Sequence, residues 1–317
     1  MRIGYFLACE EFQPHELLEQ ARLAEDAGFS FLWISDHFHP WNSQQGQSAF
    51  VWSMIGALAQ ECSLPVTTAV TCPTMRIHPA VIAQAAATSA VLLQGGFTLG
   101  LGTGEALNEH ITGQVWPPEA ERLDMLAEAV AVIRRLWSGQ VVSHRGCHFR
   151  IDTARLFTLP ESPPPIFLSA FGPKATELAA HIADGFITTK PDRKGLARFR
   201  AAKGTDAPAQ AGFKVAYAPT KQEGVSEAHR LWANEGLPGE MAQILPTPEH
   251  FEQASSLVTR EMTEESIAAG PDRDEHLAAF EPYREAGYDS VAVGNIGRYY
   301  REMIAFYGSD VLPVLQS

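Results

Sequence analysis

Two polar segments of the sequence have the residue types of an acid–base active site. Segment 35–41 (SDHFHPW) places Asp36, His37 and Trp41 directly after the short apolar run 31–34. An imidazole beside a carboxylate can accept or donate a proton near neutral pH, and an indole can form one side of a binding site for a planar molecule. We interpret His37 as a general base that Asp36 could orient. The alternatives are a histidine bonded only to backbone, an aspartate that stabilises a turn and a tryptophan that packs a loop.

The second segment, 102–109 (GTGEALNE), follows another apolar run, 97–101. Gly102 and Gly104 have no side chains, so the backbone there can approach a ligand closely. A partly buried Glu105 could retain its proton and act as a general acid. The alternative is a carboxylate that only stabilises a helix N-terminus. The two glycines alone do not make a dinucleotide-binding fingerprint.

Small or polar residues also follow three other apolar runs. Segment 69–74 (AVTCPT) has the small and β-branched residues that suit a backbone ledge behind a ring. In segment 169–173 (SAFGP) a helix opens, and its free N–H groups could hold an anion. Thr189 and Lys190 offer a hydroxyl and a cation for a phosphate or carboxylate. Ordinary strand–helix loops are the alternative for each segment.

These segments need elements that bring them to one face of the molecule. Strand-length apolar runs alternate with stretches of helical periodicity, a pattern typical of parallel strands joined by right-handed helical crossovers. Eight strands predict an α/β fold, the (β/α)8 TIM barrel, whose active sites form at the carboxyl ends of the strands. The predicted strands are 2–8, 31–34, 66–70, 97–101, 166–169, 185–188, 214–218 and 290–293, and the predicted helices are 15–27, 50–60, 80–92, 119–137, 174–182 and 299–307.

The alternation is interrupted twice. Residues 141–151 predict a β-hairpin that turns near Arg145 and Gly146, inserted before the fifth strand. Residues at about 220–282 are acidic, helical and broken by prolines, which predicts a helical insertion before the last strand. We therefore expect a single barrel domain over residues 1–317.

Composition narrows the classes of partner. The net charge is −13, and no run of Lys and Arg is long enough to follow a phosphate backbone, so we expect no nucleic-acid partner. No stretch approaches the roughly 18 apolar residues of a membrane span, and the first residues predict a strand instead of a signal peptide. The four cysteines, Cys9, Cys62, Cys72 and Cys147, lie far apart without a CxxC pair. This spacing predicts reduced thiols in a cytoplasmic protein and no zinc site.

Three segments resemble a known family. Segments 35–41 (SDHFHPW), 79–85 (PAVIAQA) and 102–109 (GTGEALNE) are similar to those of the luciferase-like flavin/deazaflavin oxidoreductases. The most similar subgroup is the one that contains coenzyme F420-dependent glucose-6-phosphate dehydrogenase. The resemblance runs from residue 2 to about 189 and is loose from there to 293.

The resemblance implies a barrel with an insertion before the last strand, usually dimeric, with coenzyme F420 over its carboxyl face. It implies a cis peptide bond, Ala69–Val70, behind the deazaflavin. His37, Trp41 and Glu105 match the catalytic positions. Two matches depart from the family, because Phe171 replaces the first of two glycines and Cys72 stands where threonine is common. The implied cofactor-binding residues are Asp36, Ala69, Val70, Cys72, Gly104, Asn108, Ala170, Phe171 and Gly172.

The implied substrate site departs further. Thr189 matches a threonine that holds the substrate phosphate in the sugar-phosphate enzymes, and Lys190 follows it. The basic residues of those enzymes align here with Asp192, with residues near 242–243 and with residues near 264–265. Acidic side chains repel a phosphate dianion, so we expect glucose 6-phosphate to be a poor substrate.

We therefore predict an F420-dependent oxidoreductase that transfers a hydride between the deazaflavin and a small alcohol or carbonyl substrate. Segments 237–248 and 295–298 resemble a sister subgroup in which FMN is thought to replace F420 in some proteins. The first alternative is thus an FMN-dependent reductase or monooxygenase of the same fold. The second is a barrel that binds a flavin or small ligand without catalysis. As partners we expect the small-molecule substrate and a second copy of the chain in a homodimer.

Overall fold

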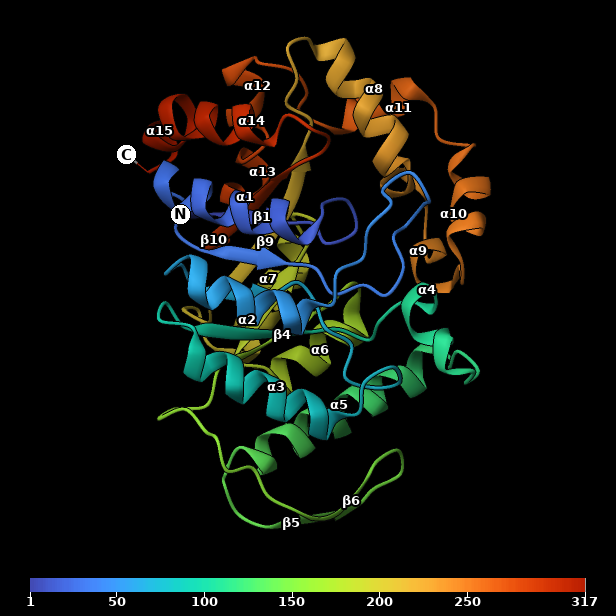
Figure 1. The fold of residues 1–317 in the computed structure, drawn as a ribbon. Helices are drawn as coiled ribbons and strands as arrows, with labels where there is room; N and C mark the ends of the chain where they lie inside the picture. The colour runs from blue at the N-terminus through green and yellow to red at the C-terminus, as the bar shows by residue number, and fades with distance from the viewer. Residues whose placement is uncertain (317) are drawn as a thin grey trace.

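Eight parallel strands close into a barrel in the computed structural model, which describes residues 1–316 (Figure 1). The chain enters the barrel at β1 and leaves it at β10, which pair with each other and complete the ring. Each strand is covered on one face by the barrel interior and on the other by helices, which explains why the strand sequences are nearly continuous apolar runs. In ring order the strands are β1 (Arg2–Leu7), β2 (Leu32–Ile34), β3 (Val66–Thr68), β4 (Phe97–Leu101), β7 (Ile166–Ser169), β8 (Gly185–Thr188), β9 (Ala209–Val215) and β10 (Ser290–Asn295).

The predicted seventh strand was placed too late in the chain. We expected it at 214–218, whereas β9 runs from Ala209 to Val215. Its first residues are too small to produce the apolar pattern that predicts a strand. Small residues are needed there because the barrel interior is already filled. The Trp33 ring lies against Gly212, where an added Cβ would be 2.2 Å from a ring carbon of Trp33. The large apolar side chain at this level of the barrel is therefore Trp33 of β2, and β9 contributes only a glycine.

Six predicted helices agree with the structure to within one or two residues, whereas α7 (Arg193–Lys203) and the short helices α4 (Ala106–Glu109) and α15 (Leu312–Leu315) were not predicted. In α7, charged residues hide the short apolar stripe. Asp192 caps its N-terminus by accepting a hydrogen bond from the Gly195 N–H. The predicted helices are α1 (Pro14–Ala27), α2 (Val51–Glu61), α3 (Pro79–Leu92), α5 (Glu119–Leu136), α6 (Pro173–Ile182) and α14 (Tyr300–Phe306).

Both predicted interruptions are present. The hairpin pairs β5 (Val142–Arg145) with β6 (Arg150–Ala154) before the fifth barrel strand. The helical insertion follows β9, and Figure 1 shows α9 and α10 near α4 (Ala106–Glu109), on the right of the view, the side toward which the β1 arrow points. Its helices are α8 (Lys221–Trp232), α9 (Met241–Ile244), α10 (Pro248–Ser255), α11 (Arg260–Ser266) and α12 (Arg273–Ala278), followed by α13 (Glu281–Ala286) before β10.

Among residues 1–316, no helix combines the length and the apolar character needed to cross a membrane.

Candidate active site

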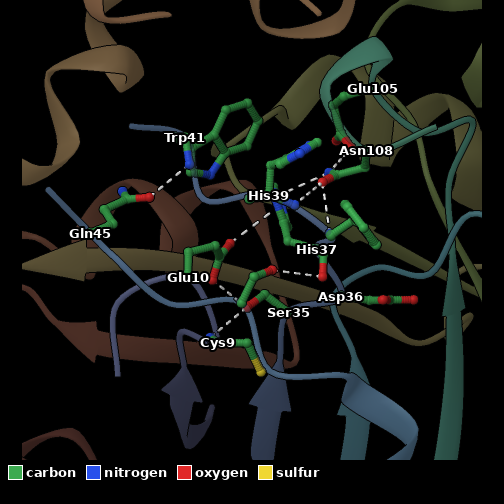
Figure 2. Close-up of polar contacts among 12 residues, drawn as sticks. Cys9, Glu10, Ser35, Asp36, His37, His39, Trp41, Gln45, Glu105 and Asn108 are labelled. Carbon is green, nitrogen blue, oxygen red and sulfur yellow. Dashed lines mark hydrogen bonds and ion pairs between the residues drawn. The ribbon is translucent and has the colours of Figure 1, made fainter. Parts of the chain in front are cut away.

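His37 lies at the end of β2 between a carboxylate and an amide (Figure 2). Its Nε2 is 3.3 Å from Oε1 of Glu10, and its Nδ1 is 3.1 Å from Nδ2 of Asn108. The Trp41 ring packs against the imidazole with centroids 4.9 Å apart. Glu10 and Asn108 are almost fully buried, so their contacts with His37 are little weakened by water. The histidine is therefore held in one orientation by groups from three strand ends.

Asn108 determines which hydrogen bonds His37 can make. Its Oδ1 accepts hydrogen bonds from the backbone N–H groups of Phe38 and His39, so its NH2 group must face His37. The Nδ1 of His37 then accepts from Asn108 when the ring is neutral. The same Nδ1 is 3.1 Å from the His39 carbonyl, which can accept a hydrogen bond when the ring is protonated. The site thus offers a partner for both protonation states of His37.

The carboxylate beside His37 is Glu10 and not Asp36. Successive residues of an extended chain point to opposite sides, so Asp36 and His37 face different surroundings. Asp36 binds Nη2 of Arg76 at 2.7 Å and accepts a hydrogen bond from Thr71 Oγ1 at 2.8 Å. Our expectation that Asp36 orients His37 was wrong at this point. Position could have identified Glu10, because it follows the first strand as Asp36 follows the second.

Arg76 is a further buried residue that the sequence reasoning missed. Besides Asp36, it contacts Glu109, whose Oε2 accepts a hydrogen bond from the Arg76 backbone N–H at 2.7 Å. Burial raises the pKa of Glu109 to about 7, although the bonds to Arg76 oppose the rise. Because Glu109 directly follows Asn108, this contact holds α4 against the loop after β3.

Glu105 is connected to His37 through the same amide. Asn108 Nδ2 lies 3.3 Å from Oε2 of Glu105, so one NH2 group contacts both proposed acid–base residues. Glu105 also lines a narrow cleft of about 60 Å³, together with Val70, Ser169 and Phe171. The two segments that the sequence singled out therefore meet at Asn108, and Glu105 of the second segment borders the cleft.

The expected ledge is present behind this cleft. The Ala69–Val70 peptide bond is cis, as the family resemblance implied. Gly104 has a positive φ of 77°, and an added Cβ there would lie 2.7 Å from Cys72 Sγ. Burial raises the pKa of the Cys72 thiol well above its ordinary value, so it packs as a neutral group under Gly104.

Other predicted residues are placed less directly. Ala170 is fully buried in the hydrophobic core, and neither its side chain nor its backbone is exposed. Gly172 caps the N-terminus of α6 with a φ of 95°. Thr189 and Lys190 lie exposed on the loop after β8, where their carbonyls face tyrosine hydroxyls of the α13 region. Neither side chain is in contact with the His37 network.

The insertion covers Trp41 with apolar side chains. Phe251 of α10 packs edge-on against Trp41, with centroids 5.0 Å apart. Behind the two rings lie further apolar residues of the insertion and α4, namely Leu107, Ala233, Leu237, Met241, Ala242, Leu245, Ala254 and Val258.

A family model described as luciferase-like monooxygenase matches residues 1–290. The chain belongs to this family. It is 33% identical, over 100% of its length and 98% of the relative's, to an F420-dependent glucose-6-phosphate dehydrogenase of Microbacterium testaceum. It is 36% identical to an F420-dependent hydroxymycolic acid dehydrogenase of Mycobacterium tuberculosis, covering 99% of this chain and 88% of that one.

A solved structure of the luciferase-like family has nearly the same shape. It is an F420-dependent secondary alcohol dehydrogenase in complex with an F420-acetone adduct. The TM-score is 0.91 at 31% identity, and the match covers 99% of this chain and 98% of that one. The family resemblance seen in the sequence is therefore confirmed.

The residues around the cleft fit the deazaflavin that these luciferase-like relatives are named for. The cis ledge is flat, and the loop at Gly104 keeps side chains away from it. Buried Arg122 lines the same cleft. Its Nη1 and Nη2 donate hydrogen bonds to the Pro117 carbonyl and to Gln243 Oε1, and among residues 1–316 its Nε has no hydrogen-bond partner. A cation with an N–H group left over is suitable for an anionic cofactor. Phe171, which is 46% exposed, lines the same cleft.

Proposed function

We propose that this protein transfers a hydride between coenzyme F420 and a small, uncharged alcohol or carbonyl substrate. The protein is an F420-dependent oxidoreductase of the luciferase-like family, and the substrate class is the new part of the proposal. The main observation in support of this reaction is a chain of contacts that runs from Glu10 through His37 and Asn108 to Glu105. Glu105 borders the cleft, which is also lined by Val70 of the cis peptide bond.

In this proposal the bound deazaflavin supplies the ring carbon that accepts or donates the hydride. Ala69, Val70 and the loop at Gly104 would form its bed. His37 takes the hydroxyl proton of an alcohol, and the resulting positive charge is stabilised by the Glu10 carboxylate and the His39 carbonyl. Glu105 would deliver a proton at the cleft edge, where Asn108 Nδ2 lies 3.3 Å from its Oε2.

The substrate class follows from the wall of the site. Trp41 and Phe251 present aromatic surface, and apolar side chains of the insertion pack behind them. In the sugar-phosphate enzymes, basic residues bind the substrate phosphate. The residues at two of the matching positions make other contacts in this protein. Asp192 caps α7, and Gln243 accepts a hydrogen bond from Arg122 Nη2 at 3.0 Å. An apolar wall favours an uncharged alcohol, aldehyde or ketone over a phosphorylated sugar.

Equilibrium titration with F420 and with FMN, measured separately by fluorescence, tests the cofactor. We expect F420 to bind more tightly than FMN. Reduction of F420 by a series of neutral secondary alcohols tests the reaction. Tight FMN binding without measurable F420 binding would overturn the proposal, and F420 binding without turnover of any alcohol or carbonyl would favour a non-catalytic carrier.

Two further expectations belong to the same proposal. We propose a homodimer, supported by the family resemblance, and a cytoplasmic location, supported by four free cysteines. Sedimentation or light scattering would test the first.

A further inference from the structure

A groove between α6 and α7 begins where the cleft ends. Phe171 and Ala175 line the cleft, and Pro173 and Lys174 line the groove, so the two hollows share the start of α6. The groove has a volume of about 520 Å³. From Pro173 to His181, its α6 side is about 12 Å long at the helical rise of 1.5 Å per residue.

The second wall of this groove is unusually basic for an acidic protein. The whole chain has 24 Lys and Arg against 37 Asp and Glu, yet α7 carries no acidic residue. Lys194, Arg198 and Ala202 are spaced four residues apart and share one face of the helix, of which Arg198 and Ala202 line the groove. The basic residues of α7 are Arg193, Lys194, Arg198, Arg200 and Lys203.

Most of these cations have no partner. Arg200 is bound to Asp289 at 2.9 Å, but within residues 1–316 the side chains of Arg193, Lys194, Arg198 and Lys203 make no ion pair or hydrogen bond. On the α6 side, Lys174 is paired with Glu119 at 3.2 Å. Unpaired surface cations raise the local concentration of anions even on a protein of opposite net charge.

We infer that this groove binds the acidic tail of the cofactor. The inference rests on the proposed function, because F420 carries a phospholactyl-oligoglutamate tail that must leave the cleft. A chain of carboxylates that leaves the cleft beside Phe171 meets the groove at Pro173 and Lys174 and can reach Arg198 on its α7 side, one helical turn from Lys194. Glu177 is the one acidic residue that lines the groove, and it weakens this attraction.

The test compares ligands with and without the tail in direct fluorescence titrations, which need no turnover. The ligands are F420 with several glutamates, F420 without glutamates, and the deazaflavin riboside without phosphate. The groove variant is Lys194→Glu with Arg198→Glu. Its matched control is Arg145→Glu with Arg150→Glu, two exposed hairpin cations whose reversal changes the net charge equally.

We expect the groove variant to bind long-tailed F420 about tenfold more weakly, with the riboside unaffected, because each exposed charge pair contributes modestly. Glu177→Gln should act in the opposite direction. Higher salt should remove both effects. Equal losses in the groove and control variants, or equal losses for F420 and the riboside, would overturn the inference. If the wild-type protein binds neither F420 nor the riboside, the proposed function fails and the inference fails with it.

Discussion

At the scale of single residues, His37 is held by groups that match both of its protonation states. Glu10 and the His39 carbonyl can accept hydrogen bonds from a charged ring, and Asn108 can donate one to a neutral ring. A base must gain and lose a proton in each catalytic cycle without moving. Partners already placed for both states reduce the reorganisation that proton transfer requires.

Replacement of His37 by alanine should lower turnover by about 10²–10⁴, the usual contribution of general acid–base catalysis. F420 affinity should change little, because His37 is not part of the ledge. Single-turnover hydride transfer and F420 titration would measure the two effects. Glu105→Gln should likewise slow the hydride step while F420 still binds. Wild-type turnover in His37→Ala between pH 6 and pH 8 would exclude His37 as the base.

The two carboxylates near His37 should respond differently to amide substitution. Glu10→Gln removes the negative charge beside Nε2 and should lower turnover by about tenfold or more, with little loss of stability. Asp36→Asn removes the nearer of the two carboxylates that pair with the buried Arg76 guanidinium and should cost about 3 kcal/mol of unfolding free energy. Urea unfolding together with steady-state kinetics would separate the effects. A loss of turnover in Asp36→Asn, together with a loss of stability in Glu10→Gln, would indicate that Asp36 orients His37.

At the scale of elements, Glu11 connects three parts of the barrel top. Its Oε2 accepts a hydrogen bond from Trp232 Nε1 of α8 at 2.6 Å, and its Oε1 accepts one from the Gly297 N–H after β10. Lys214 of β9 lies over the Trp232 ring at 3.7 Å. The insertion is thus held to the first and last strands by one buried carboxyl group. Burial raises the pKa of Glu11 to about 7.

This shift makes stability depend on pH. The folded pKa lies above the unfolded value, so the folded state holds the proton more tightly. The resulting stability is fully present below about pH 4.5 and is lost as the pH rises through about 7. From pH 5 to pH 8, Glu11 should contribute a decrease of up to about 3 kcal/mol in unfolding free energy.

Glu11→Gln should flatten this part of the pH dependence, because an amide does not titrate. Chemical denaturation at pH 5 and pH 8 would measure it. Glu121→Gln, at an exposed position of α5, is the control and should leave the pH dependence unchanged. An equally steep pH dependence in Glu11→Gln and the wild-type protein would contradict the expectation.

At the scale of the whole molecule, the barrel and the insertion contribute different kinds of surface to the site. The barrel presents the polar groups at its strand ends, and the insertion places apolar side chains above Trp41. The unpaired cations of α7 lie on the outer surface of the barrel, beside the groove. This separation of apolar and basic surface predicts an uncharged substrate together with an anionic cofactor.

Substrate selectivity should follow this division. A neutral secondary alcohol should have a kcat/KM at least about 10² greater than glucose 6-phosphate, because an unpaired phosphate dianion is costly to desolvate. Gln243→Lys, which adds a cation beside the cleft, should improve use of glucose 6-phosphate. A micromolar KM for glucose 6-phosphate in the wild-type protein would contradict this and would implicate Lys190, Arg193 or Lys194.

Local patterns in the sequence were sufficient for the architecture and for the approach of the two polar segments to each other. The carboxyl ends of parallel strands meet at one face, so segments 35–41 and 102–109 had to approach each other once the alternation of strands and helices was recognised. The family resemblance added the cis bond at Ala69–Val70, which is confirmed, and the F420 cofactor. Helix boundaries followed from periodicity and from caps such as Gly28, which adopts a left-handed conformation.

Only the tertiary structure decided which side chains face each other. Glu10 is 27 residues from His37 in sequence, and its role depends on the pairing of β1 with β2. Asp36 turned away to Arg76, and β9 began early because Trp33 fills the space over Gly212. Such contacts depend on strand register and side-chain direction, which local periodicity does not contain. Residue types near strand ends therefore predicted which segments would come together, whereas packing between strands determined which side chains would be partners.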